Sequence, residues 1–233
     1  MIYESSLQHL NEAIKIYNRF VGKTYLIAYC VNKNHPFCFT EFIFRQKHFW
    51  HLLGCEFDGE KNYTPEQKGY FYNSCLNGED VKEALNYTQS NKETDSKYAV
   101  FMKIFDIISN AKEILITETD NSPEEAVFKI GAGKMIGTIG YAKDDNSSTY
   151  FPKTVQDKSI FKINPKANKK IVFILSKPAG EQHYTEIEYE IKKEIVRDSL
   201  EELPEEILKK ISAERCGLIL DSSQCQEKSK EET

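Results

Sequence analysis

Five histidines are the side chains of this chain best suited to acid–base chemistry near neutral pH: His9, His35, His48, His51 and His183. His9 lies on the polar side of an amphipathic segment and His35 precedes a proline, so neither is favoured. His51, at the end of a predicted hairpin, and His183, at the start of a predicted strand, are the candidates for proton transfer. The alternatives are a structural role for His51, hydrogen-bonded to the backbone, and an exposed turn position for His183.

Such a pair can perform metal-free cleavage of an RNA phosphodiester. This reaction needs a base for the 2′-hydroxyl, an acid for the leaving 5′-oxygen and cations for the phosphate. Lys153 and Thr154 follow Pro152, which is predicted to end a strand and to place both side chains at a loop mouth. Lys177 ends a neighbouring predicted strand and could contact the same phosphate. The predicted catalytic set is therefore His51, His183, Lys153, Thr154 and Lys177.

Unpaired RNA is bound by stacking of bases on aromatic rings and by cations at the phosphates. Tyr72, Tyr150 and Tyr184 are the aromatic candidates for this role, and Lys143 and Lys170 are the basic ones. The alternative for each tyrosine is a place in the hydrophobic core. Only convergence of the three rings on one face would favour RNA binding.

Charge is unevenly distributed along the chain, whose net charge is −5. Residues 129–177 hold ten lysines and three acidic residues, a local balance of +7, whereas residues 186–206 have a balance of −6. Because basic surfaces attract phosphate-bearing partners, the first segment is predicted to form a contiguous basic face. The second is predicted to lie near that face and to weaken RNA binding. The alternative for both segments is ordinary solvated charge.

Two further motifs are weak. Residues 131–137 (GAGKMIG) resemble a phosphate-binding glycine loop, but they lack its spacing and lie between two predicted strands. His48 and His51 are three residues apart on a predicted helix, a spacing that can bring two imidazoles to one metal. No third ligand follows one turn away. Neither a cofactor nor a metal is therefore expected.

The elements that must position these side chains change in kind along the chain. Apolar residues at three- and four-residue steps predict a helix over residues 7–21. Aromatic and β-branched runs at 24–31 and 38–45 predict a hairpin, and helices are predicted at 65–75, 80–87 and 95–111. Short strands are predicted at 114–117, 126–130, 135–141, 149–151, 170–175 and 184–191. This order predicts an α+β fold, with helices and a hairpin followed by a mostly antiparallel sheet.

One core is expected over residues 1–195, with a helix-rich part at 1–111 and the sheet at 112–195. A helical extension at 196–220, containing a helix over 199–213, and a disordered tail at 221–233 are expected to follow. The sequence contains no apolar stretch of membrane-spanning length and no basic and apolar secretion signal. Its six cysteines are scattered, which favours free thiols in a cytoplasmic protein.

One segment carries a more specific signal. Residues 49–54 (FWHLLG), followed by Phe71 and Tyr72, resemble the phage-associated nuclease families grouped with barnase, EndoU, colicin and RelE-type ribonucleases, in particular the fourth family of that series. In that family an F-x-H-L-x-G element follows a helix and a hairpin. The later matches would be residues 150–154 (YFPKT) and Tyr184, so that the resemblance spans residues 7–193 and implies this fold and nuclease activity.

The favoured function is a metal-independent ribonuclease or toxin-like effector of a phage or mobile element, with RNA as its partner. The alternative is an inactive module of the same fold that binds RNA or a protein, such as an inhibitor or a host protein; a structural phage protein is a third reading. No membrane partner is expected. A nuclease needs at least two of His51, Lys153, Lys177 and His183 together in a cleft, whereas a binding module needs only a basic or aromatic face.

Overall fold

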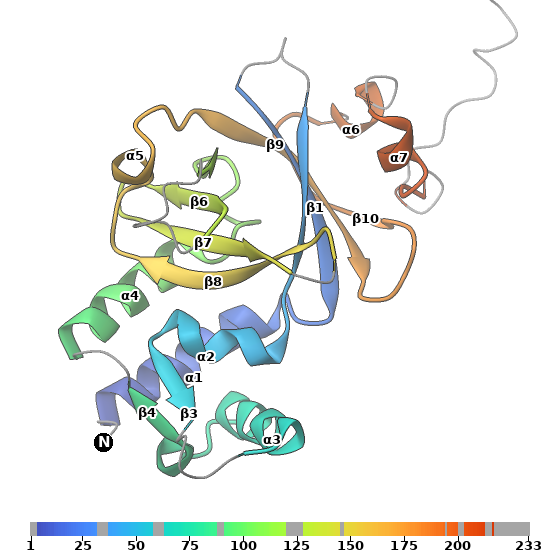
Figure 1. Cartoon of the computed structure of the whole chain (residues 1–233). Helices are drawn as coiled ribbons and strands as arrows, with labels where there is room; N and C mark the ends of the chain where they lie inside the picture. The colour runs from blue at the N-terminus through green and yellow to red at the C-terminus, as the bar shows by residue number, and fades with distance from the viewer. Residues whose placement is uncertain are drawn as a thin grey trace, which may run out of the picture.

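The computed structural model of the chain has an α+β architecture, as the sequence predicts (Figure 1). It describes residues 4–31, 37–57, 63–87, 91–119, 128–144, 147–193, 195–199, 203–212 and 216. The helices are α1 (Glu4–Asn18), η1 (Gln46–His48), α2 (Phe49–Leu52), α3 (Pro65–Leu76), η3 (Lys82–Ala84), α4 (Asn91–Ile104), α5 (Ile160–Ile163), α6 (Ile195–Asp198) and α7 (Glu205–Leu208). The strands are β1 (Lys23–Cys30), β2 (Cys38–Ile43), β3 (Cys55–Phe57), β4 (Leu85–Tyr87), β5 (Leu115–Glu118), β6 (Ile130–Lys134), β7 (Gly137–Lys143), β8 (Tyr150–Gln156), β9 (Lys169–Pro178) and β10 (Glu186–Glu190).

The main sheet has eight strands in the order β1-β2-β8-β7-β6-β5-β9-β10. An additional antiparallel pairing of β1 with β9 closes this sheet on itself, and β10 extends it beyond β9. The closure is weakest between β2 and β8, a parallel pair whose register joins Phe42 to Tyr150. Beyond Tyr150, β8 is therefore paired on one side only, with β7.

The N-terminal elements follow their apolar patterns. In α1, Leu10, Ala13, Ile14 and Tyr17 are completely buried, so the predicted amphipathic stripe is confirmed. Strand β1 is buried at every position after Lys23, because β2 and β9 flank it and side chains pack on both of its faces. The β1–β2 hairpin predicted from the sequence is likewise present.

The glycines of residues 131–140 serve close packing. They lie in the β6–β7 hairpin, where a Cβ at Gly137 would come within 2.4 Å of Val100 Cγ1 on α4. A Cβ at Gly140 would lie 2.3 Å from Cδ1 of Phe128. The glycines thus let α4 and Phe128 approach the sheet. Close packing accounts for the glycines of residues 131–137, and no phosphate-binding role is needed to explain them.

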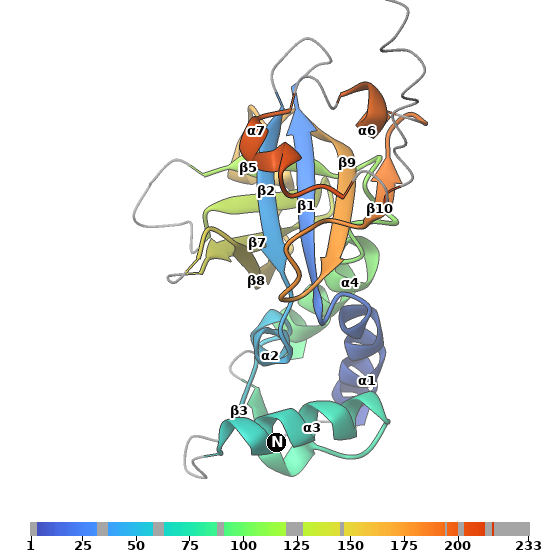
Figure 2. The same ribbon diagram turned by 90° about the vertical axis from the view of Figure 1, so that its right-hand side faces the viewer.

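Two apolar clusters stabilise the molecule. The larger lies between the helices and the sheet. The smaller lies between β1, β9 and the C-terminal segment, by which we mean the described residues 195–199 and 203–212. In Figure 2, α7 lies in front of β1 and β2 and α6 lies above β10, whereas α1, α2 and α3 lie below the strands. The C-terminal segment is anchored by Leu203 and Ile207 and by a parallel bridge between Tyr184 and Ile211.

The structure corrects three predicted elements. Residues 80–87 do not form one helix, because only Lys82–Ala84 is helical, as η3, and Leu85–Tyr87 forms β4 and pairs with β3. Strand β8 does not end at Pro152 but continues to Gln156, and it accommodates the proline where its register with β7 shifts. Within the helix predicted over 199–213, the described residues form only the short α7, with Pro204 at its N-cap, and α6 lies before this range.

Some predictions concern residues that the structure does not describe. The tail predicted at 221–233 lies outside the described residues, as does part of the strand predicted at 126–130. The division into a core and an extension stays a prediction. Among the described helices, none combines the length and the apolar character that crossing a bilayer requires.

Candidate functional site

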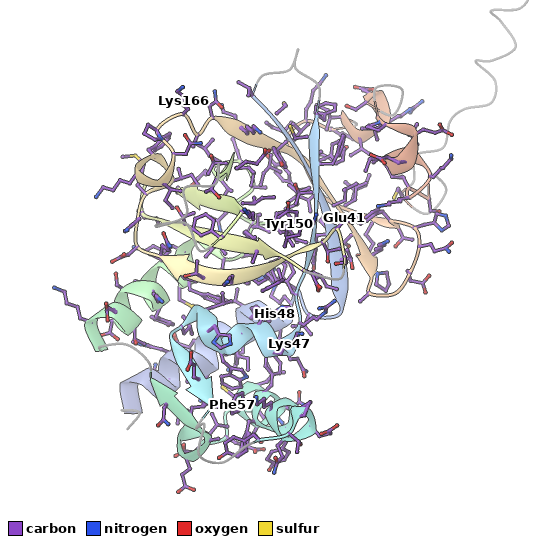
Figure 3. All side chains as sticks on the ribbon, in the orientation of Figure 1. Glu41, Lys47, His48, Phe57, Tyr150 and Lys166 are labelled. Carbon is purple, nitrogen blue, oxygen red and sulfur yellow. The ribbon has the colours of Figure 1, made fainter. Side chains whose placement is uncertain are left out.

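A cleft of about 1160 Å³ lies between the small N-terminal elements and β8. It is lined by η1 and α2, by β8 with the preceding turn, and by β3 with the start of α3. Figure 3 shows His48 near β8 and Phe57 further away, beside β3 and α3. The lining residues are Arg45, Gln46, Lys47, His48, Trp50, His51, Glu56, Phe57, Pro65, Lys68, Gly69, Asp144, Phe151, Pro152 and Lys153.

The helical period of α2 places His51 in this cleft. Phe49, Trp50 and Leu52 are almost fully buried in the main core, which leaves the side chain of His51 62% exposed. Gly54 then adopts a φ of 71°, a left-handed conformation that turns the chain into β3. As a result, Glu56 on β3 returns to His51, with Oε1 3.8 Å from the imidazole Nδ1.

Cations outnumber acids along the cleft. Arg45, Lys47, Lys68 and Lys153 line it together with two carboxylates, Glu56 and Asp144. Arg45 is held by Asp144, with 2.7 Å between Nη1 and Oδ2, and its carbonyl accepts a hydrogen bond of 2.8 Å from the hydroxyl of Tyr17. Lys47, Lys68 and Lys153 are exposed to solvent. The cleft is therefore suited to a phosphate-bearing ligand.

His48 differs from His51 in its surroundings. It is only 8% exposed, and its ring stacks on Phe151 with 4.3 Å between centroids. Burial, followed by the nearby cations of Lys47 and Arg45, lowers the pKa of His48 from 6.5 to about 4, although Asp144 opposes this shift. His48 is thus neutral at physiological pH. Its Nδ1 is buried without a hydrogen-bond partner among the described residues.

The cleft brings together two of the four side chains proposed from the sequence. His51 and Lys153 line it, whereas Lys177 and His183 are not among its lining residues. Lys177 on β9 donates a hydrogen bond to the carbonyl of Gln182 and lies 4.8 Å from the ring centroid of Tyr184. The prediction of one site containing both histidines is therefore corrected, because the β9–β10 connection belongs to the side of the sheet that the C-terminal segment covers (Figure 1).

Two of the three proposed stacking tyrosines are core residues. Tyr72 is completely buried and donates a hydrogen bond of 3.2 Å to Asn18 Oδ1. Tyr184 is also completely buried, and its hydroxyl donates a bond of 2.7 Å to Glu41 Oε1. Neither ring is available to a base, so both predictions are corrected. Tyr150 is half-buried against Phe42 and lines a second hollow of about 460 Å³.

The remaining candidates do not line the cleft either. Thr154 follows Lys153 on β8 but pairs with Gly140 of β7, is partly buried beside it and is not among the lining residues of the cleft. It is therefore removed from the predicted catalytic set. Lys143 and Lys170 are exposed on β7 and β9. A contact of these two lysines with RNA stays a prediction.

The lysines of residues 129–177 do not form one contiguous face. Lys169 and Lys170 are neighbours on β9 and point to opposite sides of the strand. Lys169 is paired with Glu118 at 2.7 Å and Lys134 with Glu113 at 2.7 Å. The positive charge of the segment is thus partly neutralised and distributed around the sheet. Lys153 is its contribution to the cleft.

The sequence reasoning missed several members of the cleft. Arg45, Lys47 and His48 precede His51 within seven residues, and this local cluster of basic residues was the signal available in the sequence. Glu56, Lys68 and Asp144 had no such signal, because β3, α3 and the β7–β8 turn bring them in from separate segments. Among the described residues, no three His, Cys, Asp or Glu side chains gather as metal ligands would.

A comparison with protein families places the chain in one of them. Residues 9–193 match the family described as phage-Barnase-EndoU-ColicinE5/D-RelE like nuclease4. This range contains the whole cleft and all strands of the main sheet. The chain belongs to this family, and the resemblance predicted from residues 49–54 is confirmed. A search of the curated proteins and a search of the solved structures each found no match to the chain.

Proposed function

We propose that the protein is an endoribonuclease that cleaves RNA in the cleft between α2, β3 and β8. The observation that carries this proposal is the exposed pair of His51 and Glu56, with 3.8 Å between Nδ1 and Oε1. Both side chains line a cleft with four cationic side chains. Membership of a nuclease family implies a nucleic acid substrate. Acid–base groups combined with phosphate-binding cations are what RNA cleavage by transesterification requires.

In the proposed reaction, the 2′-oxygen of a ribose attacks the adjacent phosphorus while the bond from phosphorus to the 5′-oxygen breaks. Glu56 accepts the proton of the 2′-hydroxyl, and the imidazolium of His51 donates a proton to the leaving 5′-oxygen. The products are a 2′,3′-cyclic phosphate and a 5′-hydroxyl.

The cations have a separate role in this reaction. Lys153 on β8 and Lys47 on η1 reach the cleft from different elements and neutralise the phosphate as negative charge develops on its oxygens. Arg45 is held in place by Asp144 at 2.7 Å, which gives its guanidinium a defined direction. His48 is buried and stacked on Phe151, so we assign it the support of that ring and no proton transfer.

The word phage in the family description supports a biological role that the sequence also favours. We propose that the protein acts as a toxin-like effector of a phage or another mobile element, with cellular RNA as its target. A protein inhibitor or host protein would be its second class of partner. A test of this role is growth arrest on induced expression of the wild-type chain, which the His51→Ala variant should relieve.

The test of the nuclease activity is incubation of the purified protein with labelled RNA in an excess of chelator. We expect 2′,3′-cyclic phosphate ends with the wild type and strongly reduced cleavage with His51→Ala and Glu56→Gln. His183→Ala is the matched control, because it removes the other proposed histidine without touching the cleft. Salt-dependent RNA binding without any cleavage would instead favour the inactive binding module.

A further inference from the structure

The two ends of the cleft differ in chemistry. Near β8 the lining holds the charged groups of Arg45, Asp144 and Lys153, beside Pro152 and the ring of Phe151, which His48 covers. Near α3 it is aromatic, because Phe57 on β3 and the edge of Trp50 face the same space as Lys68. Figure 3 shows this separation, with Lys47 and His48 toward the sheet and Phe57 toward α3. A phosphate suits the first end, and the second suits a flat apolar group.

Phe57 is held firmly by its neighbours. Trp50, Tyr63 and Phe71 surround it, with ring centroids at 5.4, 5.7 and 6.0 Å. The ring remains partly exposed, and the ammonium of Lys68 lies 5.3 Å from its centroid. Lys68 is itself exposed. Its ammonium therefore lies over the ring in the free protein and remains in contact with solvent. A ring fixed at its edges and covered by a cation is suited to stacking.

We propose that Phe57 and Lys68 form a base-binding subsite, which makes unpaired RNA the substrate class of the cleft. This inference rests on the proposed function. A base stacks on Phe57 in place of the ammonium, and Lys68 moves to the phosphate of the same nucleotide. Proteins that bind single strands combine a cationic groove with aromatic platforms in this way, because every base has an aromatic face. A duplex keeps its bases stacked inside and cannot present one to the ring.

The strand β3 sets the distance between this subsite and the reacting phosphate. Glu56 and Phe57 are consecutive residues, and both line the cleft. Because both side chains open into the same cleft from neighbouring positions of the chain, the proposed base lies beside the acid–base pair. The base on Phe57 therefore belongs to a nucleotide that flanks the cleaved bond. The ring holds that nucleotide and thereby positions the ribose at His51.

Trp50 provides a readout that is independent of cleavage. It is the single tryptophan of the chain, it lines the cleft, and its ring packs against the edge of Phe57. The probe is a short 2′-O-methylated RNA, which cannot be cleaved because its 2′-oxygen is blocked. We expect this single strand to change the emission of Trp50 on binding, and the same strand annealed to its complement to bind at least tenfold more weakly.

Substitutions at the subsite sharpen the experiment. Phe57→Leu should weaken binding of the single strand roughly 5- to 150-fold, the range expected for loss of one stacked base, whereas Phe57→Tyr should bind like the wild type. If Phe57→Leu does not fold, Lys68→Ala tests the same subsite at an exposed position. It should reduce the salt dependence of binding by about 0.7 log units per log unit of salt.

Three results would overturn the subsite. They are equal binding of duplex and single strand, wild-type affinity of Phe57→Leu, and an unchanged salt dependence of Lys68→Ala. The outcome is separable from that of the nuclease test. A protein that binds single strands through Phe57 but yields no cleavage products would refute the ribonuclease and keep the subsite. If the wild type cleaves RNA and Phe57→Leu binds the single strand as tightly as the wild type, the subsite is refuted and the ribonuclease is kept.

Discussion

The cleft and the C-terminal face, defined here by Glu41, Lys177, Tyr184 and Lys210, contain the same kinds of side chain but use them differently. On the C-terminal face the groups satisfy one another: Tyr184 donates to Glu41 at 2.7 Å, and Lys210 lies 3.3 Å from both oxygens of that carboxylate. Burial alone would raise the pKa of Glu41, but the hydrogen bond from Tyr184 and the charge of Lys210 lower it overall.

In the cleft the corresponding groups face solvent. His51 is 62% exposed, Lys47 and Lys153 are exposed, and the neighbouring carboxylate of Glu56 is 56% exposed. A lysine, an aromatic ring and a carboxylate thus make a structural network where they are partly buried and paired with one another, and a candidate site where they are open to a ligand. The type of residue is the same in both regions. Its exposure and its partners decide between packing and chemistry.

The largest expected difference between the regions is in catalysis. His51→Ala should lower RNA cleavage by ~10²–10⁴-fold, because it removes the proposed general acid. His183→Ala, on the C-terminal face, should leave the rate unchanged. Both rates are measured with a fluorescent RNA substrate, and circular dichroism checks that both variants are folded. Equal loss of activity in the two variants would contradict the assignment of catalysis to the cleft alone.

The next effect concerns the pH dependence of stability at the cleft. The pKa of His48 is about 4 in the folded protein and near 6.5 in the unfolded chain. The unfolded state therefore binds the additional proton between these values, and stability should fall as pH drops from 6.5 to 4, by an amount on the order of 3 kcal/mol. Urea unfolding at several pH values measures this loss, and His48→Gln should show a smaller one. Parallel curves for the two proteins would contradict the assignment.

A smaller effect on stability is expected at the C-terminal face. Tyr184→Phe removes the hydrogen bond to Glu41, a partly buried carboxylate, and should destabilise the fold by about 1.5–3 kcal/mol. Cleavage by the folded fraction should remain at the wild-type rate, since Tyr184 does not line the cleft. Chemical denaturation and the cleavage assay together test both statements. Lost activity in a stable variant would place Tyr184 in the functional site.

The smallest effect compares two lysines that the sequence could not distinguish. Lys153→Ala should reduce the salt dependence of RNA binding by about 0.7 log units per log unit of salt, because it removes one phosphate contact. Lys177→Ala should leave this dependence unaltered, since that ammonium is directed to the Gln182 carbonyl and the Tyr184 ring. Fluorescence anisotropy at several salt concentrations provides both slopes. Identical slopes in the two variants would argue against the cleft as the phosphate site.

Elements with a strong local signal were predictable from the sequence. The apolar period of residues 7–21 predicted α1, and the aromatic runs on either side of residue 35 predicted the β1–β2 hairpin. Pro65 marks the start of α3, where Thr64 and Gln67 form a capping box. Residues 85–87 were predicted as helix because a strand of three residues has too little pattern to be recognised, and pairing with β3 decides its conformation.

Pro152 shows why tertiary context can override a local rule. Proline lacks an N–H and is therefore expected to end a strand in the interior of a sheet. Here β8 has a shifted register with β7 beside the proline, and its register with β2 joins one residue pair, so the missing donor is tolerated. Because the strand continues, Lys153 reaches the cleft from a strand and Thr154 points away from it.

The sequence by itself determined the family, the α+β class, the first helix with the hairpin that follows it, and the helical segment that carries His51. Those features depend on local patterns of apolar residues, glycines and prolines, which act over a few neighbouring positions. Only the tertiary structure decided that His51 and Lys153 share a cleft with Glu56 and Phe57, while Tyr72 and Tyr184 are buried. The physical reason is that burial and electrostatic partners arise between segments far apart in the chain, and no local pattern records which segments meet.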